Sequence, residues 1–267
     1  MPPFSFYKDA AMKKNLLVLF LLTALIAFNG CKKDDNPVAP GGGTNTGNNS
    51  GQPMPKFDTL SNYNGVLASI QYSMDLIPGI PTNIAMAFAQ FGTTTTVSAG
   101  TVSLNSNDIP ATTSGNTVLY MIPSTTNPTA TLSNVNFNGS NHTWTVGGSS
   151  AVSAFTASVT SVSSFDLTYP TTTTTHSKAN SLAVNWSGSN SNNKVMIVMA
   201  GTAGAGSYST AELSDNGSYT IPSASLAGFS GAVMLQVVKY RYNVATAGGK
   251  SYVLMSEVIK QVTFNIN

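Results

Sequence analysis

The C-terminal stretch Val233–Tyr242, VMLQVVKYRY, and the segment Val258–Ile266, VIKQVTFNI, decide the expected fold. Val233, Leu235 and Val237 occupy alternate positions of the first stretch, as expected for a β-strand with one buried face. The second segment alternates in the same way, with one polar exception on its apolar parity. These patterns predict two long strands at the end of the chain.

The connection between these strands reads Ala-Gly-Gly-Lys at 247–250, and its glycines permit the positive φ angles that tight turns require. Upstream, Leu182, Val184 and Trp186 alternate with small or polar residues. The apolar run Val195–Met199 is typical of a strand buried on both faces. No convincing helical pattern follows residue 57, so the spacing favours an antiparallel β-sandwich.

A hairpin with one apolar face is expected over residues 135–146. Val135 and Phe137 precede a polar break, and Trp144 and Val146 follow it. The break, Asn-Gly-Ser-Asn at 138–141, supplies turn residues.

Two regions, each with one tryptophan and its own strand patterns, meet near residues 158–164. We therefore expect an all-β protein with two antiparallel β-sandwich domains, at residues 57–160 and 161–267, after a signal peptide and a disordered linker. Trp144 and Trp186 are expected to lie in the cores.

Residues 1–30 have the pattern of an export signal. Lys13 and Lys14 precede an apolar stretch of about 14 residues, which is shorter than the roughly 20 that a membrane-spanning helix needs. Met12 is an alternative start of this segment. Cys31 follows directly and is the only cysteine, so no intramolecular disulfide can form and modification of this thiol is expected.

Asn29-Gly30-Cys31 resembles the end of a bacterial lipoprotein signal, although Phe28 and Asn29 depart from its commonest form. The resemblance implies cleavage before Cys31, lipidation of its thiol, and a membrane as partner. Lys32–Asn36 is similar to the start of mature Bacteroidota lipoproteins, which implies an outer-membrane location facing the cell exterior. The alternative is an ordinary secretory signal followed by an unmodified cysteine.

Residues 31–56 are expected to form a disordered tether, because the segment from Pro37 to Pro55 has almost no apolar side chains to offset its ordering entropy. A flexible coil of this length spans on the order of 25–30 Å. Asp58-Thr59-Leu60, at its end, resembles the O-glycosylation sequence of exported Bacteroidota proteins, which implies a glycan on Thr59.

Residues 165–267 resemble immunoglobulin-like or fibronectin type III-like modules of bacterial surface lipoproteins. The resemblance rests on Phe165–Pro170, Ser181–Trp186, Val195–Val198 and Gly217–Pro222, and it implies a β-sandwich with Trp186 in its core. Residues 57–158 are similar to β-rich modules of such lipoproteins, without a named family.

Charge and motifs argue against several functions. Beyond residue 35 the chain carries seven basic and seven acidic residues, so it offers no basic surface for nucleic acid. No nucleophile elbow, metal-ligand spacing or complete phosphate loop occurs, so we predict no catalytic, metal or cofactor site. His142 is expected in the hairpin and His176 in a Thr-rich loop.

Carboxylate pairs leave a second class of function open. Glu212 with Asp215, or Glu257 with Asp166, would serve an envelope hydrolase or an accessory module of a carbohydrate-active system if folding brought them together. Glu212 and Asp215 precede Gly217, however, and we interpret them as solvated turn residues.

Tyr240, Arg241 and Tyr242 are the candidate binding patch, together with Lys239, because aromatic and cationic side chains are enriched in recognition surfaces. The alternative is that the tyrosines cover one face of a sheet while the cations extend to water. The sequence thus predicts a surface-displayed, non-enzymatic lipoprotein that serves in adhesion, in glycan or protein recognition, or in envelope structure.

Overall fold

The computed structural model describes residues 63–77, 80–93, 95–115, 117–124, 127, 129–201 and 206–267. They belong to one compact unit, Pro55–Asn267. Within these ranges the chain is almost entirely strands and loops, with one short 3₁₀ turn at Ser223–Leu226. The all-β prediction is therefore confirmed.

The largest sheet has ten strands within the described ranges. Its main path runs β13-β12-β16-β17-β1-β2-β6-β5, while β10 pairs with β17 and β14 with β12. The strands are β1 Tyr63–Ile77, β2 Ile80–Phe91, β5 Ala111–Ser114, β6 Thr117–Ile122, β10 Thr175–His176, β12 Lys194–Gly201, β13 Ser207–Ser209, β14 Leu213–Ser214, β16 Gly231–Ala247 and β17 Lys250–Ile266. Neighbours are antiparallel except that β1 and β10 run parallel to β17.

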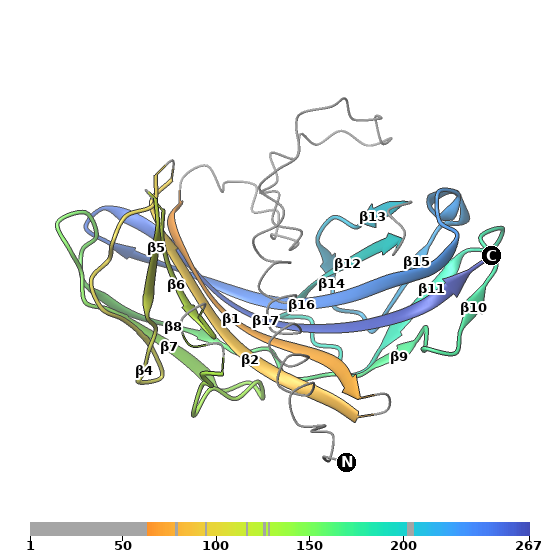
Figure 1. The fold of residues 1–267 in the computed structure, drawn as a ribbon, viewed down its shortest axis with the longest axis horizontal. Coiled ribbons are helices and arrows are strands. Elements are labelled where there is room, and N and C mark those ends of the chain that lie inside the picture. Colours follow the sequence, from red (N-terminus) through yellow and green to blue (C-terminus); the bar gives the residue numbers. More distant parts are fainter. Residues whose placement is uncertain are drawn as a thin grey trace, which may run out of the picture. The chain divides into compact units, whose positions relative to one another are not determined.

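Two smaller sheets pack against this one. The first, in the order β4-β3-β7-β8, contains β3 Val102–Leu104, β4 Asn107–Asp108, β7 Asn141–Val146 and β8 Phe155–Thr160. The second, in the order β15-β11-β9, contains β9 Leu167–Tyr169, β11 Leu182–Trp186 and β15 Ser218–Ile221. Strand β8 contacts β16 and β17, and β9 contacts β17. Figure 1 shows the two small sheets near opposite ends of the long β16–β17 pair.

The two long C-terminal strands form as the sequence predicts. They pair in continuous register, from Gly231 opposite Ile266 to Ala247 opposite Lys250. The turn residues Gly248 and Gly249 have φ angles of 56° and 73°, the left-handed region that glycine enters without steric cost.

Alternation along β16 and β17 divides the side chains between the two faces of the large sheet. On the face covered by the small sheets, Val233, Leu235 and Val237 are completely buried and join the main core. The other face carries its own apolar cluster, whose described members all come from the large sheet: Ala68, Met196, Val238, Tyr240, Val253, Met255 and Ile259. Met196 lies on one face of β12 while Val195 and Ile197 lie on the other, which confirms a strand buried on both faces.

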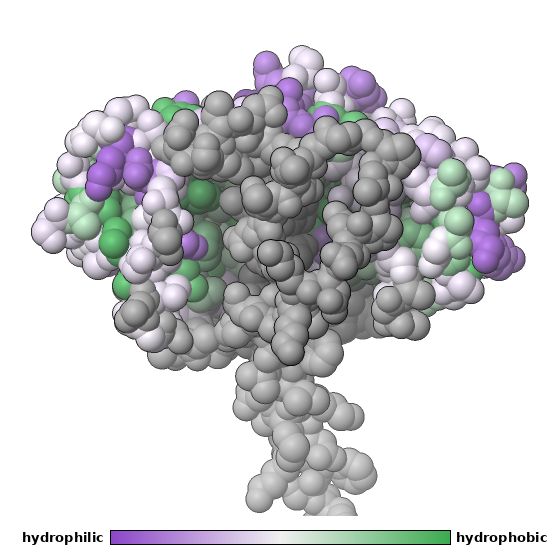
Figure 2. Space-filling model, turned by 90° about the horizontal axis from the view of Figure 1, so that it is seen from above, coloured by the Kyte–Doolittle hydropathy of each residue, from purple (hydrophilic) through white to green (hydrophobic). Residues whose placement is uncertain are grey.

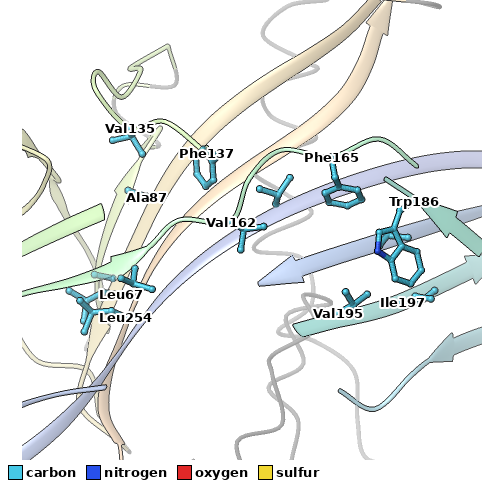
Figure 3. Close-up of a cluster of buried hydrophobic side chains, with 14 of the residues drawn as sticks. Leu67, Ala87, Val135, Phe137, Val162, Phe165, Trp186, Val195, Ile197 and Leu254 are labelled. Atoms are coloured by element: carbon cyan, nitrogen blue, oxygen red, sulfur yellow. The ribbon is translucent and has the colours of Figure 1, made fainter. Parts of the chain in front are cut away.

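Trp144 and Trp186 are buried, with exposed fractions of 0% and 5%, as predicted. Figure 3 shows Trp186 near Phe165 and Val195, and a second group around Leu67 farther along the same core. Both groups belong to one continuous apolar cluster.

The predicted hairpin over residues 135–146 is wrong in its first half. Val135 and Phe137 are buried, but they lie in a loop without strand structure. β7 pairs instead with β8 and β3. Residues 131–140 have no strand structure, so the alternation of Val135 and Phe137 reflects burial of a loop and not a strand.

The expected boundary between residues 160 and 161 coincides with the passage from one small sheet to the other. The large sheet, however, contains strands from both sides of this boundary. Strand β1 pairs with β17, from Tyr63 opposite Ser251 to Ser73 opposite Lys260. The described parts of residues 57–160 and 161–267 therefore share one sheet and one compact unit.

The coloured part of the face seen in Figure 2 is only weakly polar. Figure 2 shows mostly pale residues, with few strongly hydrophilic ones and scattered apolar ones. This agrees with a chain in which 8% of residues are charged, about a third of the usual share.

Candidate functional site

The alternation of β16 separates the predicted binding patch. Lys239 and Arg241 share the parity of Val237, on the face covered by the small sheets, whereas Tyr240 belongs to the opposite cluster. Tyr240 is only 1% exposed, while Tyr242 is 39% exposed. One surface presenting all three side chains does not form, because consecutive residues of a strand point to opposite faces.

Lys239 is completely buried in an ion pair. Its Nζ lies 3.1 Å from Asp215 Oδ2, and both side chains have no exposed surface. The ammonium also donates to the carbonyl oxygens of Ser187 and Gly188, at 3.0 and 2.8 Å. These three acceptors match its three hydrogens. Burial lowers the pKa of Lys239, and the hydrogen bond and charge of Asp215 oppose that shift.

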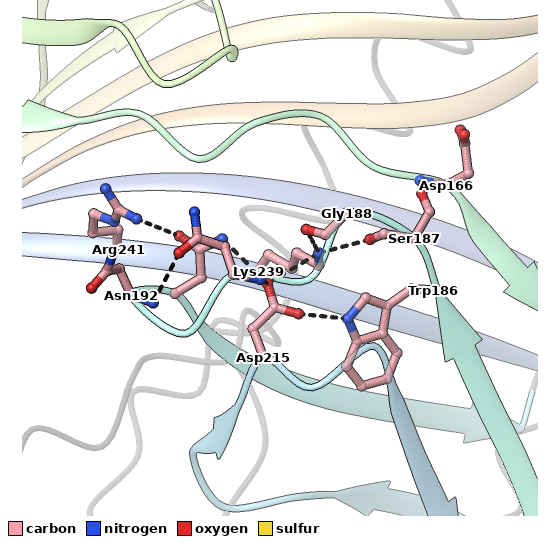
Figure 4. Close-up of polar contacts among 10 residues, drawn as sticks. Asp166, Trp186, Ser187, Gly188, Asn192, Asp215, Lys239 and Arg241 are labelled. Carbon is pink, nitrogen blue, oxygen red and sulfur yellow. Dashed lines mark hydrogen bonds and ion pairs between the residues drawn. The ribbon is translucent and has the colours of Figure 1, made fainter.

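Asp215 is the centre of this polar network, shown in Figure 4. Its Oδ1 accepts a hydrogen bond of 2.7 Å from Trp186 Nε1. Its Oδ2 accepts from the backbone of Asn190 at 3.1 Å and from Asn193 Nδ2 at 3.2 Å. With the lysine, these donors satisfy the buried carboxylate.

Asp215 is not the solvated turn residue that we expected, whereas Glu212 lies in a loop with a partly exposed side chain. Asp215 is 3% exposed. Glu212 pairs with Lys194 at 3.0 Å and accepts a 2.9 Å hydrogen bond from Tyr240. The sequence contained one sign of this arrangement: Lys239 continues the apolar parity of Val233–Val237, and a lysine buried there needs an acidic partner.

Next to this network lies a polar pocket of about 250 Å³. Its lining consists of small polar residues, glycines and one arginine: Gly139, Ser161, Ser163, Gly188, Ser189, Asn190, Asn193 and Arg241. These residues come from the loop before β7, the passage between the two small sheets, the loop before β12, and β16. The pocket thus lies where the two small-sheet regions meet above the long strands.

Arg241 is the only charged side chain lining the pocket as the structure describes it. Its Nη2 donates to Asn193 Oδ1 at 3.0 Å, and its buried Nε has no hydrogen-bond partner. Neither ion pair of the described residues includes Arg241. A guanidinium is always protonated and has five N–H donors, so this one has capacity left for an anionic group.

The wall of the pocket formed by Gly139 and Ser161 is held by hydrogen bonds between the Ser161 hydroxyl and the backbone. The Gly139 amide donates to Ser161 Oγ at 3.0 Å, and that hydroxyl donates to the Asn136 carbonyl at 3.1 Å. Beneath it, the amide of Val162 donates to Ser256 Oγ at 3.2 Å, which ties the passage to β17. The wall is therefore fixed to the sheet that carries Arg241.

The two histidines lie outside the lining of this pocket. His142 is on β7, completely buried, with Nδ1 2.7 Å from Ser69 Oγ and Nε2 3.0 Å from the Asn136 carbonyl oxygen. Burial lowers its pKa. Ser69 is also completely buried, so substrate cannot reach this Ser-His pair. His176 lies on β10 with Nε2 3.0 Å from the Asn180 carbonyl oxygen.

The proposed carboxylate pairs do not meet in a cleft. Glu212 and Asp215 are each occupied by a lysine. Glu257 lies on the parity of Met255 and Ile259, on the sheet face opposite the small sheets, whereas Asp166 is exposed beside β9. The described residues also contain no group of three or more His, Cys, Asp or Glu side chains placed to hold a metal ion.

A second pocket, of about 390 Å³, lies between β3, β4 and β6. Asp108 is the one charged residue in its described lining, which otherwise consists of aliphatic side chains, Thr101, Pro110 and Asn127. With one exposed carboxylate, Thr101 and Asn127 as its polar groups, this pocket has no cation and fewer polar side chains than the pocket beside Arg241.

Several expectations fall outside the described residues: the signal peptide, the lipidation of Cys31, the tether, the glycan on Thr59, and most of the glycine-rich loop before β13. Among the residues that are described, none form a helix of sufficient length and hydrophobicity to cross a membrane. Comparison with known family models and with curated proteins found no match for this chain.

Proposed function

We propose that this chain is a non-enzymatic lipoprotein of the outer membrane, displayed toward the cell exterior, whose β-sheet unit recognises a surface glycan. The observation that carries this proposal is the pocket beside Arg241. It combines one cation, Arg241, whose described side-chain hydrogen bond uses only Nη2, with a lining of hydroxyl, amide and glycine groups. Polar hydroxylated ligands match such a lining better than apolar ligands do.

The N-terminal sequence supports display. Diacylation of Cys31 would bury two acyl chains in the membrane, and each methylene contributes about 0.8 kcal/mol, so two chains give a stable anchor. The polar segment up to residue 56 would then hold the unit away from the lipid headgroups. In this arrangement Thr59 lies at the end of the tether, where an O-linked glycan would be accessible.

Glycan recognition is favoured over protein recognition by the size and lining of the pocket. Protein interfaces of stable complexes usually contain buried aromatic anchors. Here the pocket lining has no aromatic residue among the described ones, and Tyr242 lies on the other face of the sheet. Adhesion to glycan-bearing surfaces follows from the same pocket. A purely structural role in the envelope would not require this pocket.

The alternative, an envelope hydrolase or accessory module, has less support. A glycosidase needs two carboxyl groups about 5–9.5 Å apart across the scissile bond. The pocket lining contains no carboxylate among the described residues, and the neighbouring Asp215 is committed to Lys239 and Trp186.

A glycan array tests this proposal with the full-length lipoprotein purified in detergent. We expect selective retention of a subset of glycans by the wild type. Ser189→Tyr, which adds bulk from an exposed position of the pocket lining, is expected to abolish that retention. Lys178→Ala, an exposed substitution outside the lining, is the matched control. Absence of retention by the wild type, or equal retention by wild type and Ser189→Tyr, would contradict the proposal.

A further inference from the structure

The pocket beside Arg241 has an unbalanced charge. Three charged groups meet in this region: Lys239 and Asp215, which neutralise each other at 3.1 Å, and Arg241, whose described hydrogen bond goes only to the neutral amide of Asn193. The net charge is therefore positive by one unit, on a side chain that is itself partly buried. An isolated cation in such surroundings is costly unless an anion or several acceptors approach it.

We infer that this pocket binds the carboxylate of an acidic sugar residue, with Arg241 as the recognising group. The inference rests on the proposed function and specifies its ligand. A carboxylate accepts two parallel N–H bonds from a guanidinium, a geometry that an ammonium or a hydroxyl does not offer.

Asn193 fixes the position of the guanidinium. Its Nδ2 donates to Asp215 and its Oδ1 accepts from Arg241, so the two bonds define the orientation of the amide. Because Asn193 is 4% exposed and held by the buried ion pair, Arg241 is supported by a rigid network. A preorganised donor loses less entropy on binding than a free surface arginine does.

The remainder of the lining fits a sugar ring better than a peptide. Ser163, Ser189 and Asn190 offer hydroxyl and amide groups in the same lining as the guanidinium, and two glycines leave the wall without side chains. A peptide carboxylate would bring an apolar side chain or backbone for which this lining has no apolar partner. At about 250 Å³ the pocket is slightly smaller than sites for drug-sized ligands, which begin near 300 Å³, and so is suited to one ring.

Calorimetric titration of the full-length protein with methyl glucuronide tests the inference. The same sugar as its methyl ester, methyl glucoside, glucose 6-sulfate and acetate are the comparison ligands. We expect binding of the glucuronide, and at least about tenfold weaker binding of the ester and glucoside, because both lack the charged acceptor that a guanidinium binds. Acetate is expected to bind weakly since it lacks the ring hydroxyls.

Two variants locate the effect. Arg241→Gln is expected to reduce glucuronide affinity at least about tenfold. Arg241→Lys keeps the charge but loses the planar guanidinium, so its affinity should lie between those of the wild type and Arg241→Gln. If Arg241→Gln fails to fold, Ser189→Tyr serves instead, because residue 189 is exposed. Lys178→Ala is the control and should bind as the wild type does.

The outcomes separate this inference from the proposed function. Glycan retention with equal affinity for glucuronide, ester and glucoside would overturn the carboxylate inference and leave glycan recognition standing. Tighter binding of the sulfate than of the glucuronide would also overturn it, in favour of a sulfated ligand. Binding of acetate as tight as that of glucuronide would replace the sugar with a free or peptide carboxylate. Absence of retention of every glycan would remove both proposals.

Discussion

The buried ion pair joins Lys239 on β16 to Asp215, which directly follows β14. Lys239 and Asp215 lie at the centre of the polar network that supports the pocket, and each has its hydrogen-bonding capacity filled. Removing one member of such a pair leaves the other charge buried and unpaired, which is far more costly than losing an exposed pair.

We expect Asp215→Asn to lower the free energy of unfolding by about 3–5 kcal/mol, because Lys239 loses its counter-ion in a buried site. Urea denaturation of wild type and variant checks the value. Lys194→Met is the control. It removes an ion pair whose partners are 41% and 26% exposed, and it should cost less than about 1 kcal/mol. Equal losses in the two variants would contradict the buried network.

We expect Glu257 to make the free energy of unfolding depend on pH. Burial raises its pKa from 4.5 to about 8, so between these values the folded protein holds a proton that the unfolded chain has released. The folded state then binds more protons, and stability falls as pH rises through this range, by at most about 1.4 kcal/mol per pH unit. The contribution of Glu257 protonation to the stability of the folded state is fully present below pH 4.5 and is lost above about pH 8.

Glu257→Gln is expected to remove this dependence, because an amide does not titrate. Thermal unfolding of both proteins from pH 5 to pH 9 measures it. The wild type should lose stability toward pH 9 relative to the variant. Parallel curves for the two proteins would show that Glu257 does not carry the effect.

Single residues were predicted best where one physical requirement dominates. Burial of Trp144 and Trp186 follows from their size and apolar surface. The role of Asp215 was not predicted, because its partners are 22 to 29 residues away in the chain and only the fold brings them together. Arg241 was predicted as a binding residue, but its contact with Asn193, 48 residues away, was not. Tyr240 was assigned to the exposed patch from composition, which ignores the alternation of the strand.

At the scale of elements, the β16–β17 pair is the feature that local sequence specifies most completely. Its alternation, its length and its Gly-Gly turn all favour the same hairpin. Residues 135–146 show the opposite case: four apolar residues and a polar break fit a hairpin locally, but Val135 and Phe137 are buried from a loop. Local alternation does not distinguish a strand from a loop that covers a core.

The turn offers a test of this interpretation. Gly249 has a φ of 73°, and a Cβ atom at this position would meet no other atom within 4 Å, so substitution there acts through the backbone alone. Gly249→Val should destabilise the protein by about 1–2 kcal/mol, because a β-branched residue avoids left-handed conformations. Gly249→Asn should cost clearly less, since asparagine tolerates them. Thermal melts compare the two, and equal effects would argue against a left-handed requirement.

At the scale of the whole molecule, the large sheet joins the two halves of the chain. The parallel pairing of β1 with β17 places a strand from the first half beside the last strand of the second. Sequence patterns predicted the all-β class, and they placed a domain boundary between residues 160 and 161. They could not predict this pairing, because alternation does not specify which distant strand lies alongside.

We expect residues 161–267 not to fold as a fragment. Without β1, an edge of β17 would lose its hydrogen-bond partners from Val253 to Lys260, and apolar residues on both faces would be exposed. Circular dichroism and urea denaturation of the fragment and of the full chain measure the difference. A cooperative unfolding transition in the fragment, similar to that of the full chain, would show two independent domains.

One measurement tests both surface display and ligand recognition. It is the binding of a fluorescent glucuronide-containing oligosaccharide to intact cells that express the full chain. Cells with the wild type should bind the oligosaccharide and lose it after external protease treatment. Cells with Arg241→Gln at the same surface level should bind little. Equal binding by wild-type and Arg241→Gln cells, or wild-type binding only after the cells are broken, would contradict a surface-displayed lipoprotein that recognises its ligand through Arg241.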